Sequence, residues 1–375
     1  MDSKALHSSM RNQDRAASRS GFRWGSAGWV GALVAVVVVA ALVWSVVQIA
    51  VERADPGVAR SPSVSTPEGV PLLAEIWSVT DAVWNAGSWF ILDRHAGQVH
   101  RVDAGGLRLY SFGREGLGPG EFRNPQALVV HGDSVIVAER SGVLHVYGLE
   151  GNHIADRPVD LRECTGPGVE DLIATARTLV LVAVCLKPDL AMEARLLTVG
   201  SDADWRVISR SSPSHNGDRR VNPYWAPVLT SFGPAIAFGL VAEDCLDILD
   251  LDGLAERRVC HDNLRRLPVS RADARSLRDL ARQGQSTGFR VETPSTLPPF
   301  DAVFDGGNGK LLYRTPSPAG IDAKRLVRLG KNGREEVLDL PPAPYVFVSG
   351  RQALLAWDAA EGSHLQFQAL DAIQE

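Results

Sequence analysis

The sequence predicts an all-β fold, a six-bladed β-propeller closed by an N-terminal strand, preceded by a single transmembrane helix and carrying one short helical insertion. Three observations support this prediction. A unit of about 45 residues recurs along the chain, one copy of that unit opens with a turn-rich stretch, and an uncharged run long enough to cross a membrane precedes residue 50. With 375 residues, 45% hydrophobic and 22% charged, the composition is that of an ordinary globular protein.

The best-defined unit covers residues 113–150. Its first part is rich in turn-forming residues, with glycine or proline at 116, 118, 119, 120 and 125. Three apolar runs of strand length follow, at 127–130, 134–138 and 143–147. Short strands separated by glycine-centred turns are typical of antiparallel meanders, so this unit is expected to form one sheet.

The same pattern precedes this unit by one repeat. Residues 81–94 align without a gap on residues 127–140, an offset of 46, and Gly97 to His100 align on Gly142 to His145, an offset of 45. A period in this range that contains four strands is typical of a propeller blade.

Four further copies follow downstream, at 171–185, 228–243, 300–315 and 345–358. The last copy lacks residues for its outermost strand. The apolar stretch 71–78, which precedes the first copy, is expected to supply it. Pairing the first and last strands in one blade would close the ring and leave no open sheet edge between the chain ends.

The N-terminal region divides into three parts before the propeller at 71–372. Residues 1–26 are expected to form a disordered basic cytoplasmic tail. Residues 27–49 are expected to form a transmembrane helix, because 27–47 carry no charge, with Trp29 and Trp44 near the two interfaces. The Pro- and Ser-rich residues 50–70 are a linker.

The basic residues precede the apolar run, so the positive-inside rule places the N-terminus in the cytoplasm and the propeller in the periplasm or outside the cell. A cleavable signal peptide is the alternative, but its apolar core is usually shorter and no A-x-A-like site follows the run.

Four cysteines lie in the region predicted to be exported. Separations of 21 and 15 residues suit bridges within blades, which favours the disulfides Cys164–Cys185 and Cys245–Cys260 in an oxidising compartment. The alternative is that all four are buried free thiols. No Cys-x-x-Cys spacing supports a zinc site.

A helical insertion is expected at 270–284. Ser270 and Asp273 resemble a capping box, and Gly284 can end the helix. Apolar residues lie on one face, at 274, 277, 280 and 281. We expect this face to pack over one mouth or rim of the propeller.

The stretch GLGPGEFRNP at 116–125, followed by a β-hairpin, resembles the opening of an NHL-type repeat. The exported region as a whole resembles bacterial, membrane-anchored six-bladed NHL-like propellers. This resemblance implies a central channel and two loop-rich faces, which in the family bind proteins, peptides, sugars or nucleic acid. Some relatives are lyases or lactonases, but their metal-binding residues have no counterpart that we can place in this sequence.

The sequence predicts no catalytic, cofactor-binding or metal-binding residue. Five histidines occur in the first two blades, at 95, 100, 131, 145 and 153. Because His100 and His145 hold equivalent positions in adjacent blades, they need not be close, and structural or solvent-facing roles are expected. Arg94 and Arg140 are equivalent turn residues, expected to be exposed, with a charged ladder along one face as the alternative.

A possible binding surface consists of polar and aromatic residues outside the strand pattern. Trp, Tyr and Arg carry most of the energy at interfaces when exposed. The candidates are Arg220, Asn222, Tyr224, Trp225 and Phe300. The alternative is that the aromatic residues fill the space between blades.

The sequence favours binding over catalysis. The expected role is a binding or scaffolding module for an unidentified protein, peptide or carbohydrate partner, attached to the membrane by its N-terminal helix. A net charge of −5 without a long basic run argues against nucleic acid. One alternative is a lactonase-like hydrolase or lyase with a metal at the channel mouth. Another is a sensory ectodomain, which would signal through a separate membrane partner because its 26-residue tail is short.

Overall fold

The computed structural model describes residues 72–370, with several gaps. The segments outside the described residues are 1–71, 75, 162–163, 165–167, 187–191, 200–203, 212–219, 222–224, 250–255, 262, 272–273, 276–277, 280–289, 292–293, 308–309, 318–319, 330–333, 360–361 and 371–375.

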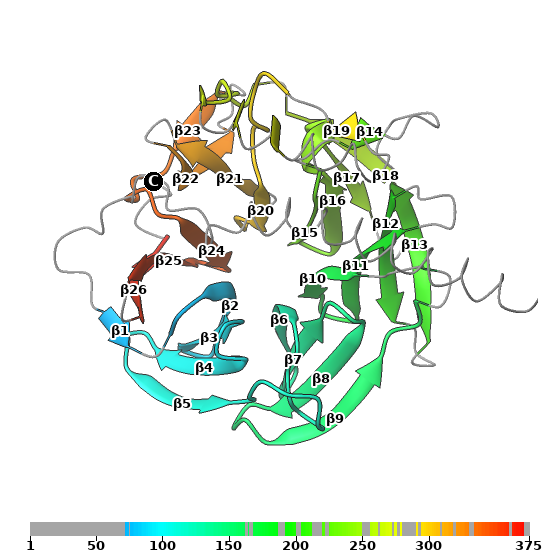
Figure 1. The fold of residues 1–375 in the computed structure, drawn as a ribbon, viewed down its shortest axis with the longest axis vertical. Coiled ribbons are helices and arrows are strands. Elements are labelled where there is room, and N and C mark those ends of the chain that lie inside the picture. The colour runs from blue at the N-terminus through cyan, green and yellow to red at the C-terminus, as the bar shows by residue number, and fades with distance from the viewer. Residues whose placement is uncertain are drawn as a thin grey trace, which may run out of the picture. The chain divides into compact units, whose positions relative to one another are not determined.

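Six four-stranded antiparallel sheets surround a common axis (Figure 1). Blade 1 consists of β2 (Val79–Asn85), β3 (Ser88–Asp93), β4 (Gln98–Asp103) and β5 (Arg108–Phe112). Blade 2 consists of β6 (Pro125–His131), β7 (Ser134–Glu139), β8 (Val143–Gly148) and β9 (His153–Pro158). Blade 3 consists of β10 (Gly168–Ala174), β11 (Leu179–Leu186), β12 (Met192–Val199) and β13 (Trp205–Ser211).

The second half of the ring repeats the arrangement. Blade 4 consists of β15 (Pro227–Phe232), β16 (Ala235–Leu240), β17 (Cys245–Leu249) and β18 (Glu256–Cys260), with the 3₁₀ turn η1 (Val241–Glu243) between its second and third strands. Blade 5 consists of β20 (Ala302–Asp305), β21 (Leu311–Ser317), β22 (Gly320–Leu329) and β23 (Glu335–Val337). Blade 6 contains β24 (Tyr345–Ser349), β25 (Gln352–Ala359) and β26 (Gly362–Ala369). A separate parallel pair joins β14 (Arg220–Val221) to β19 (Arg290–Val291).

Local chemistry explains the hairpins. In blade 1, two residues join β2 to β3, and both have left-handed backbone: Ala86 at φ 46° and Gly87 at φ 83°. This is the conformation that the twist of a two-residue hairpin requires. Apolar residues fill both faces of the inner strands, because each blade is covered on both sides by its neighbours.

The N-terminal strand β1 (Leu72–Ala74) completes blade 6. It pairs antiparallel with β26, with Leu73 opposite Ser363. The prediction that the stretch 71–78 closes the ring is therefore confirmed. Ile76, directly after β1, is 1% exposed and lies in a core cluster that joins blade 6 to blade 1 and includes Phe347 and Trp89. The closing segment therefore contributes both a strand and core packing.

The core consists of layers between consecutive blades. The clusters that the structure describes combine residues of blades 1 and 2, 2 and 3, 4 and 5, 5 and 6, and 6 and 1. The largest fully buried side chains include Trp89, Trp357, Phe90 and Phe122. Each blade is thus stabilised mainly by its neighbours, as in other repeat architectures.

Both predicted disulfides are present. Cys164–Cys185 joins the segment ahead of blade 3 to β11, and Cys245–Cys260 joins directly opposite residues of β17 and β18. Two structural disulfides within one domain are typical of secreted or periplasmic proteins.

Two other predictions fall wholly or partly outside the described residues. Within the expected helix at 270–284, the backbone is helical at 271, 274, 275, 278 and 279, and the amide of Ala274 donates to the carbonyl of Ser270 at 2.9 Å. The residues of its apolar face beyond Ala274 are not among the described ones, so its packing stays a prediction. In the described part of the chain, no helix has the length and hydropathy needed to span a bilayer; the span at 27–49 lies outside that part.

Ring closure is tested by truncating Ile76. The substitution Ile76→Ala should lower the free energy of unfolding by about 2–4 kcal/mol, because it leaves a cavity between blades 6 and 1. Leu72→Ala, on the same segment but 38% exposed, should cost less than about 1 kcal/mol. Urea unfolding of the full chain measures both. Equal effects of the two substitutions would argue against a closing role for this segment.

The disulfides give a second stability test. Each closes a loop of about the length for which chain entropy predicts roughly 3 kcal/mol. Replacing Cys245 and Cys260 together by serine should therefore lower the unfolding free energy by about 2–4 kcal/mol. Peptide mapping without reductant should recover both bridges from natively exported protein, and four free thiols would refute the assignment.

Candidate functional site

Three aspartates occupy equivalent positions at the start of the inner strands of alternate blades. They are Asp81 in blade 1, Asp171 in blade 3 and Asp301 in blade 5, and we call them the axial carboxylates. The pairing of the inner strand with the second strand is irregular between Val79 and Asp81 and, likewise, between Val169 and Asp171. Such bulges turn a side chain away from the regular alternation.

The innermost strand of a blade pairs on one edge only, so its other edge carries backbone groups without ladder partners. Asp81 satisfies two of these groups. Its Oδ1 accepts the amide of Ala82 at 2.8 Å, and its Oδ2 accepts the amide of Leu128 at 2.7 Å. Because Leu128 lies on β6, this carboxylate connects the inner strands of blades 1 and 2. Asp171 accepts the amide of Leu172 at 2.7 Å.

Asp301 differs from the other two because it is neutralised by cations. Arg314 Nε lies 2.7 Å from its Oδ1, and Lys324 Nζ lies 2.8 Å from its Oδ2. Arg314 also donates to the carbonyl of Val346 in blade 6 at 3.1 Å. Burial alone would raise the pKa of Asp301, but these cations outweigh burial and hold that pKa at about 2. Asp301 is therefore ionised and paired.

Asp81 and Asp171 carry protons far more readily. Burial raises the pKa of Asp81 to about 6, against the opposing effects of its two amide bonds and the charge of Arg314. Burial raises the pKa of Asp171 well above its usual range, and the negative charge of Asp81 adds to this rise. Blades 1, 3 and 5 are not neighbours in the ring, so these charges act on one another across the axis.

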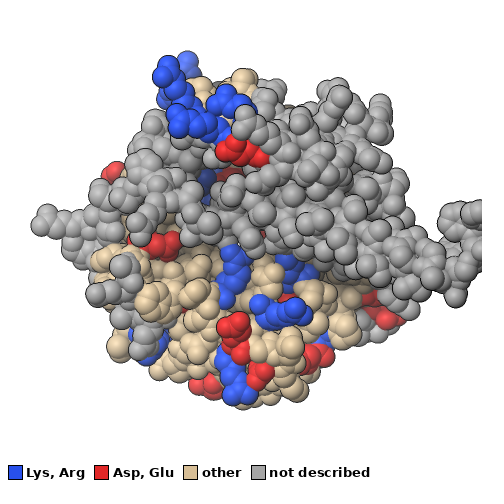
Figure 2. All heavy atoms as spheres, viewed as in Figure 1, with Lys and Arg blue, Asp and Glu red and all other residues tan. Residues whose placement is uncertain are grey.

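Arg140 and Glu170 extend the charged region between blades 2 and 3. Arg140 follows β7 and is only 4% exposed, and its guanidinium lies 2.8 Å from Glu170. Burial raises the pKa of Glu170, while Arg140 and Arg94 partly offset it. The expectation of an exposed charge at Arg140 is therefore wrong, because a carboxylate of the next blade pairs with it. Figure 2 views the molecule from the same side as Figure 1. It shows basic side chains near the middle of the described surface, with acidic side chains close by.

Two residues of the predicted binding surface are buried in the structure. Trp225 is 6% exposed and Phe300 is 0% exposed, and Phe300 packs against Tyr313 in the core between blades 4 and 5. Both side chains are buried and offer almost no area to a partner. Phe300 fills the space between two blades, which was the alternative to a surface role. The backbone of Arg220 lies in β14, its side chain is outside the described part, and residues 222 and 224 lie outside it too. The surface role of these three stays a prediction.

The histidines His100 and His145 belong to matching hydrogen-bonded clusters. Each follows a buried carboxylate, Asp93 in blade 1 and Glu139 in blade 2, that ends the second strand. Asp93 accepts the amide of Trp77 at 2.6 Å, and Glu139 accepts amides of the equivalent segment before β6. These carboxylates attach each blade's second strand to the segment leading into its first strand. Both histidines are buried beside them, at 3.9 Å in blade 1 and 3.6 Å in blade 2, as expected of structural residues.

Six four-stranded sheets form a closed ring, which defines this protein as a six-bladed β-propeller. No protein-family model matches the sequence, and neither does any curated protein, so the NHL resemblance stays a prediction. Three similar solved structures are a luciferin-regenerating enzyme (9% identity, 80% of this chain, 94% of that chain, TM-score 0.46), streptogramin B lyase (10%, 82%, 96%, 0.42) and the calcium-binding regucalcin of Agrobacterium tumefaciens strain C58 (10%, 76%, 84%, 0.44). At these identities the similarity concerns the fold alone.

The raised pKa of Asp81 predicts a specific pH dependence of stability. Folded Asp81 keeps its proton up to about pH 6, whereas the unfolded chain releases it near 3.8. The stability contribution of this carboxyl is therefore fully present below pH 3.8 and declines as pH rises to about 6. Relative to Asp81→Asn, the wild-type unfolding free energy should fall by about 1–2 kcal/mol between pH 4 and 7, allowing for partial solvent access.

The exposed Asp133, in the turn between β6 and β7, provides the matched control. Wild type relative to Asp133→Asn should show no comparable decline over the same range. Urea titrations at closely spaced pH values measure both differences, and a flat or rising curve for Asp81→Asn would contradict the assignment.

Proposed function

We propose that the chain is a membrane-anchored, extracytoplasmic β-propeller that acts as a binding or scaffolding module for a protein, peptide or carbohydrate partner. The predicted span at 27–49 would attach it to the membrane. The two disulfides support an oxidising compartment for the propeller. The observation that carries the binding role is the group of axial carboxylates.

Asp81 and Asp171 suit a ligand that presents hydrogen-bond donors, such as the ammonium of a peptide or the hydroxyls of a sugar. Each carboxyl uses part of its hydrogen-bonding capacity on backbone amides of the inner strands. An approaching positive group would favour the ionised form that burial disfavours, so binding and deprotonation would reinforce one another. Asp301, Arg314 and Lys324, already paired with one another, would line the site and contribute one net positive charge.

The alternative with a metal at the channel mouth needs at least three ligand groups that converge on the axis. In the described part of the chain, the axial carboxylates do not form a group with ligand atoms within 4.8 Å of one another. Asp301 is engaged by Arg314 and Lys324. One observation still favours the hydrolase or lyase alternative: Asp81, with a pKa of about 6, suits general acid–base catalysis. The test below therefore includes a turnover assay.

The proposal is tested with the full chain in detergent micelles on peptide and glycan arrays. Ligands that bind specifically should lose at least about tenfold affinity with the double substitution Asp81→Asn and Asp171→Asn, a loss of roughly 1.4 kcal/mol or more. Asp133→Asn should bind as the wild type does. Calorimetric titration of the strongest ligand measures the three affinities.

Two outcomes would overturn the proposal. Ligands that bind the double variant as tightly as the wild type would place the binding site away from the axis. Turnover of a panel of lactones and esters that is lost in the double variant but kept in Asp133→Asn would favour the enzyme alternative instead.

A further inference from the structure

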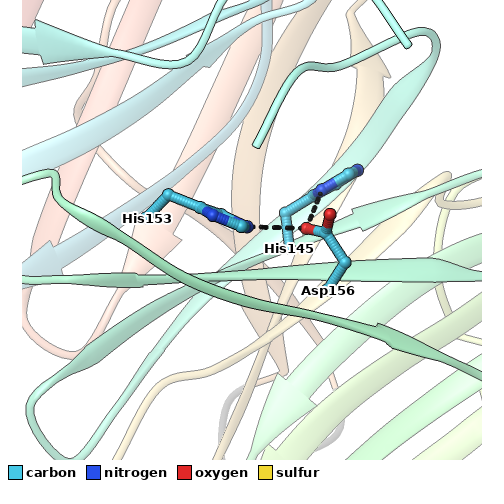
Figure 3. A group of neighbouring side chains, drawn as sticks. All are labelled: His145, His153 and Asp156. Atoms are coloured by element: carbon cyan, nitrogen blue, oxygen red, sulfur yellow. Dashed lines mark hydrogen bonds and ion pairs between the residues drawn. The ribbon is translucent and has the colours of Figure 1, made fainter. Parts of the chain in front are cut away.

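Three potential metal ligands converge on the outer strands of blade 2, a blade that contributes none of the axial carboxylates. His145 lies on β8, and His153 and Asp156 lie on β9; we call these three residues the outer cluster. Their ligand atoms all lie within 4.8 Å of one another, and they are the group of three with this property in the described part of the chain. Figure 3 shows both imidazoles directed at the Asp156 carboxylate.

The distances within the outer cluster are short. His145 Nδ1 lies 2.7 Å from Asp156 Oδ1, and His153 Nε2 lies 2.8 Å from the same oxygen. A tetrahedral zinc ion with bonds of about 2.0–2.1 Å holds its ligand atoms about 3.3 Å apart. The ligand atoms that now share hydrogen bonds would therefore need to separate by only about 0.5 Å. His153 and Asp156 are partly exposed, so they have room to adjust and an ion can reach them.

A β-bulge brings the three side chains to one face. Residues three apart on a regular strand point to opposite faces, which would separate His153 from Asp156. The pairing of β8 with β9 shifts between Val146 and Tyr147, so that His145 lies opposite Asp156 and Tyr147 lies opposite His153. This shift accommodates one extra residue on β9 and places both potential ligands beside His145.

The surroundings hold the two imidazoles in place. Glu139 Oε1 lies 3.6 Å from Nε2 of the buried His145, the nitrogen that points away from Asp156. This distance is longer than a hydrogen bond. A small approach of Glu139 would give the carboxylate contact on the far nitrogen that orients metal-binding histidines in known sites. His153 lies beside Tyr147, whose hydroxyl donates to the carbonyl of Gly120.

Gly120 itself lies against the His153 ring. A methyl group at this position would come within 2.8 Å of the ring Cγ, and its φ of +69° favours glycine. The glycine-rich stretch ahead of blade 2 thus forms one wall of the outer cluster. The sequence assigned these glycines to turns alone.

Blade 1 shows which part of this arrangement is general. There, His100 occupies the position of His145, and its Nδ1 bonds Ser111 at 2.7 Å. Ser111 stands in the place of Asp156, and Arg108 stands in the place of His153. The buried carboxylate and first histidine are therefore shared structural features, whereas the second histidine and the aspartate are particular to blade 2.

We propose that the outer cluster is a zinc site, with His145 Nδ1, His153 Nε2 and an Asp156 carboxylate oxygen as ligands. Two imidazoles and one carboxylate are a ligand set suited to zinc. Zinc would replace the two hydrogen bonds to Asp156 and tie β8 to β9 beside the glycine-rich stretch. A fourth position remains for water or a group from a partner. This site is independent of the binding role proposed for the axial carboxylates.

The test uses the full chain in detergent micelles, purified without a polyhistidine tag and freed of metal with a chelator. Titration with zinc chloride in a calorimeter should show one strong site per chain, and zinc should raise the thermal unfolding midpoint. His153→Ala and Asp156→Asn should each weaken zinc binding by at least about tenfold and abolish the thermal shift. His95→Ala, which removes an exposed histidine of blade 1, should bind zinc as the wild type does.

Cobalt provides a second measurement. Bound at the same site it should give visible absorption bands typical of tetrahedral coordination, which zinc should displace. Circular dichroism of each variant in chelator establishes that it is folded, and Asp156→Asn alone suffices if His153→Ala is not. The proposal is overturned if metal-free wild type binds no zinc at micromolar concentration, if both cluster variants bind like the wild type, or if His95→Ala loses as much affinity as they do.

Discussion

The pairing of β1 with β26 is the interaction on which the propeller depends. Without it, blade 6 would expose the outer edge of β26, and the segment around Ile76 would leave the core between blades 6 and 1. Each blade buries its two faces against its neighbours, so a ring opened at one place loses packing on both sides of the opening. The inner strands, and with them the axial carboxylates, keep their positions only while the ring is closed.

Closure also creates an electrostatic constraint at the centre. Six inner strands present unpaired backbone edges to one axis, and these polar groups need partners. Asp81 provides them for two strands, at the cost of placing a carboxylate where burial disfavours its charge. Burial also disfavours the charged form of Asp301, but ion pairs with Arg314 and Lys324 stabilise that form. The same position of the repeat thus holds a carboxyl whose pKa is about 6 in one blade and one whose pKa is about 2 in another, because Arg314 and Lys324 pair directly with the second.

Features that depend on residues close in the sequence could be predicted, whereas contacts between distant segments could not. The blades, the closing strand and both disulfides follow from the repeat and from local spacing. The electrostatic influence of Asp81 on Asp171, and of Arg314 on both, arises only when the ring closes, although an aspartate recurring in alternate copies was a visible signal. The burial of Trp225 and Phe300 depends on how neighbouring blades pack. The outer cluster depends on a bulge, and counting along β9 alone would have separated its residues.

Blade 6 is assembled from segments at opposite ends of the described chain, with Leu73 and Ser363 as partners. Among the strand pairings of the described residues, this one has the longest sequence separation, so the entropy of closing it is the largest. Five blades can form as their own segments become available, but the sixth must wait for β26. A chain that folds as it emerges from its N-terminus would therefore keep β1 unpaired until β26 is available, and would close its ring after the other five blades have formed.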